Sequence, residues 1–209
     1  PYGQRIYTIT RIVTEQTLFR ILDIRAEGTE HLTTAPPVIV APVHRSNLDS
    51  LIVGTLGRRR LPTLAKDSLF ALKPVAWWIA GLGAIPLDRN AADREATRAA
   101  REILDSGRPL RIFPEGTRQT GQRIGELFDG TPWIAAKTGA SIVPVGIAGT
   151  EAALPPGARF PHRTAVGVVA LEPITMPEGR VPRSKLTELT ELMRTRLQQA
   201  NDRAHELIA

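Results

Sequence analysis

The chain has 209 residues, enough for one domain with a full hydrophobic core. It carries 27 lysines and arginines against 21 aspartates and glutamates, and the resulting net charge of +6 favours an anionic partner such as a phosphate ester, a lipid headgroup or a nucleic acid. The chain contains no cysteine, which excludes a thiol nucleophile, a thioester on the protein, disulfide bonds and thiolate metal sites.

The first segment, residues 5–22, has the pattern of an amphipathic helix. Its apolar positions are Ile6, Ile9, Val13 and Leu22, and its basic positions are Arg5, Arg11 and Arg20. A basic amphipathic helix can lie on an anionic membrane, or it can pack against the rest of the domain. We therefore interpret residues 1–32 as an N-terminal amphipathic segment, with membrane binding as one of two roles, and residues 33–209 as the main domain.

From residue 38 onward, short apolar runs alternate with helical stretches. This alternation predicts an α/β fold, in which a single domain contains a mixed, mostly parallel sheet flanked by helices. The expected strands are residues 38–43, 61–65, 84–87, 110–113, 142–147 and 165–171. The expected helices are residues 48–56, 73–80, 92–104 and 133–137, followed by a final helix with an apolar stripe from Leu186 to Leu207.

A histidine and an acid lie close together just after the first predicted strand. His44 is followed five positions later by Asp49, and it is the only one of the four histidines with an acid at that spacing. With His44 before the helix and Asp49 in its first turn, the carboxylate can reach the imidazole and make it a general base. However, Ser46 and Asp49 also fit a capping box, in which Asp49 serves only the helix N-terminus. The pair alone leaves both roles open.

A second polar cluster follows the strand predicted at residues 110–113. Residues 113–118 read Phe-Pro-Glu-Gly-Thr-Arg, a glycine loop ending in an arginine, whose planar guanidinium suits phosphate binding. The ends of strands in a mostly parallel sheet converge on one edge where ligands bind. The sequence therefore predicts that this loop and His44 belong to one site.

Other functions that fit a glycine loop or a histidine lack their required residues. Residues 116–121 have the glycine spacing of a P-loop, but Gln122 and Arg123 stand where Lys-Ser or Lys-Thr is needed. There is no Gly-x-Ser-x-Gly elbow and no His-Glu-x-x-His zinc helix, and the scattered histidines predict no metal site. The sequence also has no zinc-finger, RNP or arginine-aromatic pattern, so we expect no nucleic-acid partner.

Four segments occur in the order and spacing of the motifs of a known family. The four segments are His44-x-x-x-x-Asp49, Gly83-Ala-Ile-Pro-Leu-Asp-Arg89, Phe113-Pro-Glu-Gly-Thr-Arg118 and Val143-Pro-Val-Gly-Ile147, and Ala65-Lys66 also fits. Over about residues 38–149, the chain thus resembles the glycerolipid acyltransferase family, specifically its lysophosphatidate acyltransferase-like group. The chain departs from the pattern at Val43, where many members have Asn, and at Asp129, where a lysine is common.

This resemblance implies that residues 33–209 form an acyltransferase domain. Such a domain would transfer a fatty acyl group from acyl-CoA or acyl carrier protein to a hydroxyl of lysophosphatidate or a related lysophospholipid, forming phosphatidate. We expect no cofactor, and we expect peripheral attachment to an anionic membrane surface at the cytoplasmic face of the cell membrane. The alternatives are acylation of glycerol 3-phosphate, hydrolysis of the acyl thioester by the same base, and a membrane-binding module without activity.

The resemblance also suggests a role for each site residue. His44 would remove the proton from the acceptor hydroxyl while Asp49 fixes the imidazole tautomer. The expected substrate-binding residues are Lys66, Arg89, Glu115, Gly116, Thr117 and Arg118. Among them, Arg89 and Arg118 are candidates for the acceptor phosphate, and Glu115 is expected to orient an arginine or a glycerol hydroxyl. The apolar residues around Trp77 and Trp78 would belong either to the core or to the wall of an acyl groove.

Overall fold

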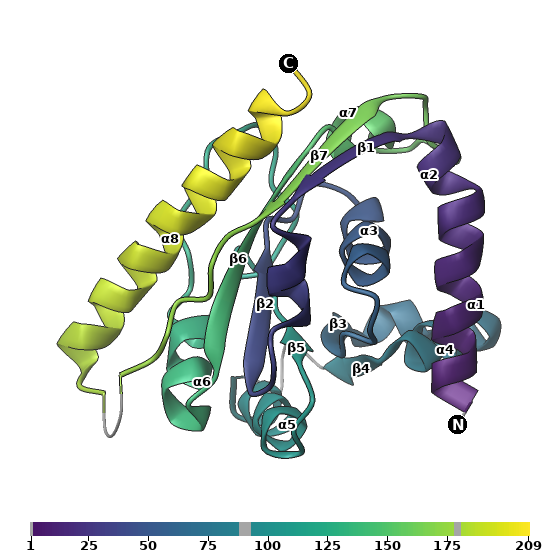
Figure 1. Ribbon diagram of the computed structural model, residues 1–209. Coiled ribbons are helices and arrows are strands. Elements are labelled where there is room, and N and C mark those ends of the chain that lie inside the picture. The colour runs from purple at the N-terminus through teal and green to yellow at the C-terminus, as the bar shows by residue number, and fades with distance from the viewer. Residues whose placement is uncertain (1, 88–92, 178–180) are drawn as a thin grey trace.

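One mixed sheet of seven strands organises the protein, in the order β1-β7-β6-β2-β5-β3-β4 (Figure 1). The structure is a computed structural model that describes residues 2–87, 93–177 and 181–209. The strands are β1 (Asp23–Glu27), β2 (Val38–Pro42), β3 (Thr63–Lys66), β4 (Ala84–Leu87), β5 (Leu110–Arg111), β6 (Ser141–Ala148) and β7 (Ala165–Ala170). Neighbouring strands run parallel except for β6 and β7, which are antiparallel. The predicted α/β fold with a mostly parallel sheet is confirmed.

Helices cover both faces of this sheet (Figure 1). The helices are α1 (Tyr2–Gln16), α2 (Leu18–Ile21), α3 (Leu48–Leu56), α4 (Lys73–Leu82), α5 (Asp93–Asp105), α6 (Gly130–Thr138), α7 (Thr150–Ala153) and α8 (Arg183–Glu206), with 3₁₀ turns at Thr29–Thr33 and Asp67–Phe70. The long α8 lies against β6 and β7 and contacts α6, whereas α1 packs on α3 and α4 on the other side. Within the described ranges, no helix is both long and apolar enough to cross a membrane.

The neighbouring strands β2 and β6 form an apolar centre in the sheet, as expected for parallel strands with helices on both faces. Every residue of β2 is buried, and β6 is buried from Ile142 to Ala148. Gly146 of β6 and Gly167 of β7 allow α8 to lie directly on the sheet, because a Cβ at either position would collide with the helix backbone at Ala200 or Ala204. The apolar stripe predicted for the final helix therefore covers the sheet.

Two features of the N-terminal segment differ from the sequence prediction. The helix expected over residues 5–22 is divided into α1 and α2 at Thr17, whose hydroxyl donates to the Val13 carbonyl at 2.6 Å, a local bond that competes with regular helix. No strand was expected at Asp23–Glu27, yet β1 pairs with β7 along its full length. The sheet therefore begins inside the segment of residues 1–32.

Replacing Gly146 with alanine should destabilise the protein by more than about 2 kcal/mol, because the new methyl group must push α8 off the sheet. The free energy of unfolding in urea measures the effect. Gly125→Ala is the matched control, since a Cβ there meets nothing within 4 Å. Equal stability of the two variants would show that α8 is not packed as closely as described.

Candidate active site

Three loops meet at the carboxyl edge of the sheet. Strand β2 pairs in parallel with β6 on one side and with β5 on the other. The residues that follow these strands therefore leave the sheet side by side. They bring together His44 after β2, Glu115 after β5 and Thr150 after β6, although Glu115 is 71 residues from His44 along the chain. The two polar clusters of the sequence thus form one site.

The imidazole of His44 contacts the carboxylate of Asp49. Nδ1 of His44 lies 3.0 Å from Oδ2 of Asp49, and the Asp49 side chain is 0% exposed. The same oxygen accepts the backbone N–H groups of Arg45 and Ser46, each at 2.7 Å. Asp49 therefore binds the N–H groups ahead of α3 and the imidazole with one oxygen, so the capping contact and the histidine contact occur together. Because Asp49 takes Nδ1, Nε2 is the ring nitrogen left to act on a substrate.

Phe113 packs against the face of the His44 ring. The two rings are stacked, with centroids 4.0 Å apart and planes at 24°. The guanidinium of Arg111 lies 5.6 Å from the Phe113 ring centroid and donates to the Ser50 carbonyl at 2.7 Å. Burial lowers the pKa of Arg111 to about 10, and the negative charge of Asp49 opposes this shift. The guanidinium therefore remains charged at neutral pH beneath the site.

Arg45 and Glu115 form a buried ion pair that ties the two loops together. Nη1 of Arg45 lies 2.9 and 2.8 Å from the two carboxylate oxygens, and the side chains are 4% and 1% exposed. Glu115 also accepts the backbone N–H of His44 at 2.9 Å, and Nε of Arg45 donates to the Gly121 carbonyl at 2.9 Å. Sequence reasoning did not identify Arg45, and the only signal was its position next to His44.

The glycine loop turns at Gly116, which has φ of +71°. Its N–H donates to the Phe113 carbonyl at 3.0 Å, and the N–H of Thr117 donates to the Glu115 carbonyl at 2.8 Å. These two N–H groups are thus engaged inside the loop. The side chains of Thr117 and Arg118 are exposed and remain available to a ligand.

The other predicted site residues are more distant or undescribed. Lys66 is exposed at the end of β3, separated from β2 by β5 in the sheet. Arg89 lies outside the described residues. In the part of the chain that the structure describes, no three histidine or acidic side chains gather in a way that could hold a metal ion.

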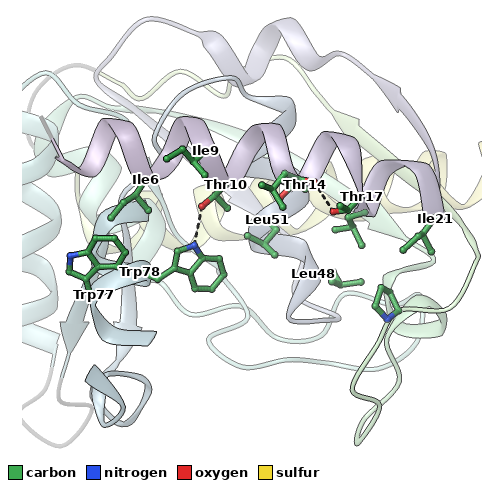
Figure 2. A pocket seen from close by; sticks show the side chains of 13 residues that line it. Ile6, Ile9, Thr10, Thr14, Thr17, Ile21, Leu48, Leu51, Trp77 and Trp78 are labelled. Atoms are coloured by element: carbon green, nitrogen blue, oxygen red, sulfur yellow. Dashed lines mark hydrogen bonds between the residues drawn. The ribbon is translucent and has the colours of Figure 1, made fainter. Parts of the chain in front are cut away.

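An apolar groove of about 550 Å³ runs along α1 (Figure 2). One wall is α1, and Leu48 and Leu51 of α3 face it. Trp77 and Trp78 line one end, where the indole N–H of Trp78 donates to the Thr10 hydroxyl at 2.9 Å. Trp77 is 60% exposed and Trp78 is 37% exposed, so they belong to the groove wall rather than to the core. Since Leu48 precedes Asp49, the groove reaches the helix that carries the Asp49 carboxylate.

Comparison with known proteins identifies the family. A family model described as Acyltransferase matches residues 23–148. The chain belongs to this acyltransferase family. The matched segment contains His44, Asp49 and the whole glycine loop. It ends at Ala148, two residues before Thr150.

Relatives in this acyltransferase family have similar sequences and folds. The chain is 27% identical to a chloroplastic 1-acyl-sn-glycerol-3-phosphate acyltransferase of Arabidopsis thaliana, over 92% of this chain and 56% of that protein. It is 26% identical to a 1-acyl-sn-glycerol-3-phosphate acyltransferase of Saccharomyces cerevisiae, over 84% of this chain and 59% of that protein. The crystal structure of PlsC, the 1-acyl-sn-glycerophosphate acyltransferase of Thermotoga maritima, matches with a TM-score of 0.71 at 27% identity, covering 95% of this chain and 76% of that one. The chain spans a little over half the length of the first two relatives.

Replacing Arg45 with methionine should destabilise the protein by about 3–5 kcal/mol, because Glu115 would keep a buried charge without its partner. Thermal and urea unfolding measure the loss. Arg101→Met is the matched control, because Arg101 pairs with Asp105 on the surface with both side chains more than half exposed, and it should change stability by less than about 0.5 kcal/mol. A small effect of Arg45→Met would contradict the proposed link between the loops.

Proposed function

We propose that the protein is an O-acyltransferase that moves a fatty acyl group from an acyl thioester to the free hydroxyl of lysophosphatidate or a related lysophospholipid, forming phosphatidate. The observation that carries this proposal is the buried Asp49 carboxylate on Nδ1 of His44, placed beside a loop that exposes Arg118. The names of the relatives support the acceptor, since each is a 1-acyl-sn-glycerol-3-phosphate acyltransferase.

In the proposed reaction, His44 is the general base. Nε2 accepts the proton of the acceptor hydroxyl while the hydroxyl oxygen bonds to the thioester carbonyl carbon. The resulting tetrahedral intermediate collapses as its C–S bond breaks, and the imidazolium returns the proton to the departing thiolate. Asp49 keeps Nδ1 protonated and stabilises the imidazolium between these steps. The products are an ester and a free thiol, and no acyl group is bonded to the protein.

The exposed residues around this base would bind the substrates. We assign the acceptor phosphate to Arg118 and Arg89, assisted by Thr117, because a guanidinium binds phosphate through two parallel hydrogen bonds. Lys66 would bind phosphates of the donor or acceptor, or stabilise the oxyanion. To Glu115 we assign the first of the two roles expected for it, orienting an arginine: its carboxylate is buried between Arg45 and the N–H of His44, so it positions the base loop instead of contacting substrate. We propose acyl-CoA or acyl carrier protein as the donor, with no cofactor.

The apolar groove would bind the acyl chain, and α1 would contact the membrane. An apolar groove beside the catalytic helix suits a fatty acyl chain. Ile9 and Val13 of α1 are 62% and 53% exposed, and arginines flank them along the helix. This combination suits an anionic membrane surface. We therefore propose that α1 attaches the protein to the cytoplasmic face of the cell membrane.

Replacing His44 with alanine should lower the rate of acyl transfer by about 10²- to 10⁴-fold, the usual contribution of a positioned general base. The rate is measured as thiol release together with mass spectrometry of the lipid products, using lysophosphatidate, glycerol 3-phosphate and neutral lysolipid acceptors. His162→Ala is the matched control, because His162 has an exposed side chain outside the site, and it should retain the wild-type rate.

Three outcomes of the same experiment would overturn the proposal. Near-normal transfer by His44→Ala would remove the base from the mechanism. Thiol release that is equal with and without any acceptor would instead identify a thioester hydrolase. A product formed from glycerol 3-phosphate but not from lysophosphatidate would assign the other acyltransferase reaction.

Replacing Ile9 and Val13 together with glutamate should weaken binding to anionic lipid vesicles by at least about tenfold, because two charges would enter the apolar surface of α1. Vesicle co-sedimentation at two lipid compositions, anionic and zwitterionic, measures this binding. Leu192→Glu is the control, since Leu192 is an exposed leucine on α8, on the far side of the sheet. Equal loss in both variants would argue that α1 is not the membrane surface.

A further inference from the structure

A hydroxyl from a distant part of the chain completes the surroundings of the Asp49 carboxylate. Oδ2 of Asp49 contacts Nδ1 of His44 and accepts hydrogen bonds from the backbone N–H groups of Arg45 and Ser46. Oδ1 accepts the hydroxyl of Thr150 at 2.7 Å, from 101 residues away. Both side chains are fully buried. The two carboxylate oxygens are therefore held from two different loops.

The backbone around Gly149 brings Thr150 to this position. Strand β6 runs parallel to β2, with Val145 opposite Pro42, so its end leaves the sheet beside the His44 loop. Gly149 follows with φ of +84°, and a Cβ there would collide with the Ala165 carbonyl oxygen. Only glycine fits this turn, which begins α7 with Thr150 facing the Asp49 carboxylate.

The chemistry of the hydroxyl suits the task of orienting a carboxylate. A bond to each oxygen fixes rotation about the Cβ–Cγ bond, so Oδ2 stays directed at Nδ1 of His44. A lysine or arginine at position 150 would also hold Oδ1, but its positive charge would offset the negative charge that stabilises the imidazolium. A neutral hydroxyl fixes the direction of the carboxylate and leaves its charge for His44.

We propose that Thr150 is a positioning residue for the acyl transfer: its hydroxyl fixes the plane of the Asp49 carboxylate and thereby the orientation of His44. This inference rests on the proposed function of the His44–Asp49 pair. Thr150 does not touch the reacting atoms and acts through Asp49. It lies beyond the segment matched by the family model.

Replacing Thr150 with valine, which keeps the shape and removes the hydroxyl, should lower kcat by about 10- to 10²-fold, since a small misalignment of a base is costly. The KM for donor and acceptor should stay within about twofold of wild type, because neither substrate contacts Thr150. Thr150→Ser restores a donor and should recover most of the rate. Thr150→Ala provides a second variant without the hydroxyl should the valine variant fold poorly.

The matched control is Thr190→Val. The Thr190 hydroxyl is also buried and also donates to an aspartate, Oδ1 of Asp129, at 2.7 Å, but it lies on α8 away from the site. The Thr190→Val variant should lose stability as Thr150→Val does, but it should keep the wild-type kcat. Comparable losses of kcat in the two valine variants, or normal kcat in Thr150→Val, would overturn the proposal.

A double-mutant cycle tests whether Thr150 acts through Asp49. In an Asp49→Ala background, Thr150→Val should lower kcat by less than about twofold further, because the carboxylate that it orients is gone. If the two losses instead multiply independently, Thr150 has a role apart from Asp49 and the proposal is wrong.

A spectroscopic measurement separates this inference from the proposed function. The Nδ1 proton of His44 should give a low-field ¹H NMR resonance, assigned by its absence from His44→Gln. The resonance should persist in Thr150→Ser and Thr190→Val and be broadened or lost in Thr150→Val. An unchanged resonance in Thr150→Val refutes the positioning role. Absence of acyl transfer by the wild type refutes the proposed function, while the resonance still decides the role of Thr150.

Discussion

The parallel pairing of β2 with β5 on one side and β6 on the other is the constraint on which the candidate site depends. Ile39 of β2 lies opposite both Leu110 and Ile142. Because the three strands are parallel and in register, the loops that follow them begin at one edge of the sheet. That edge collects His44, Glu115 and Thr150 from three separate parts of the sequence. The apolar β2 and β6 hold the sheet together, and the polar loops take their positions from its register.

Two buried carboxylates then make the loops rigid. Asp49 and Glu115 are both buried, and a buried charge without partners is strongly unfavourable. Each carboxylate instead has several partners. Asp49 contacts the His44 ring, two backbone N–H groups and the Thr150 hydroxyl. Glu115 contacts the Arg45 guanidinium and the backbone N–H of His44. These bonds join the loop after β2 to the loops after β5 and β6, so the His44 side chain is held in a defined orientation. Thr117 and Arg118 stay exposed. The buried acids thus position His44, the proposed base, and the exposed side chains are those proposed to bind ligand.

The sequence revealed those features that depend on local pattern. Strand β4 and helix α3 begin and end at the predicted residues, because apolar runs and a glycine or capping residue mark their limits. The contact between His44 and Asp49 was predictable because the two residues are five positions apart and the helix begins between them. Strand β1 escaped prediction because three of its five residues are charged and it lies at the edge of the sheet, where no apolar run is required. The Arg45–Glu115 pair and the Thr150 bond join residues 70 and 101 positions apart, and only the strand order brings them together.

Helix α3 links the His44–Asp49 pair to the apolar groove. It is held on three sides by polar contacts: Asp49 accepts from Thr150, the Ser50 carbonyl accepts from Arg111 at 2.7 Å, and the Gly54 carbonyl accepts the Tyr7 hydroxyl at 3.1 Å. The partners come from α7, β5 and α1, so the helix cannot shift without breaking bonds to all three. The same helix presents Leu48 and Leu51 to the groove (Figure 2). In the proposed function, an acyl chain in the groove therefore has a fixed position relative to the Asp49 carboxylate, one residue beyond Leu48. The proposed alignment of base and lipid thus depends on the placement of one short helix.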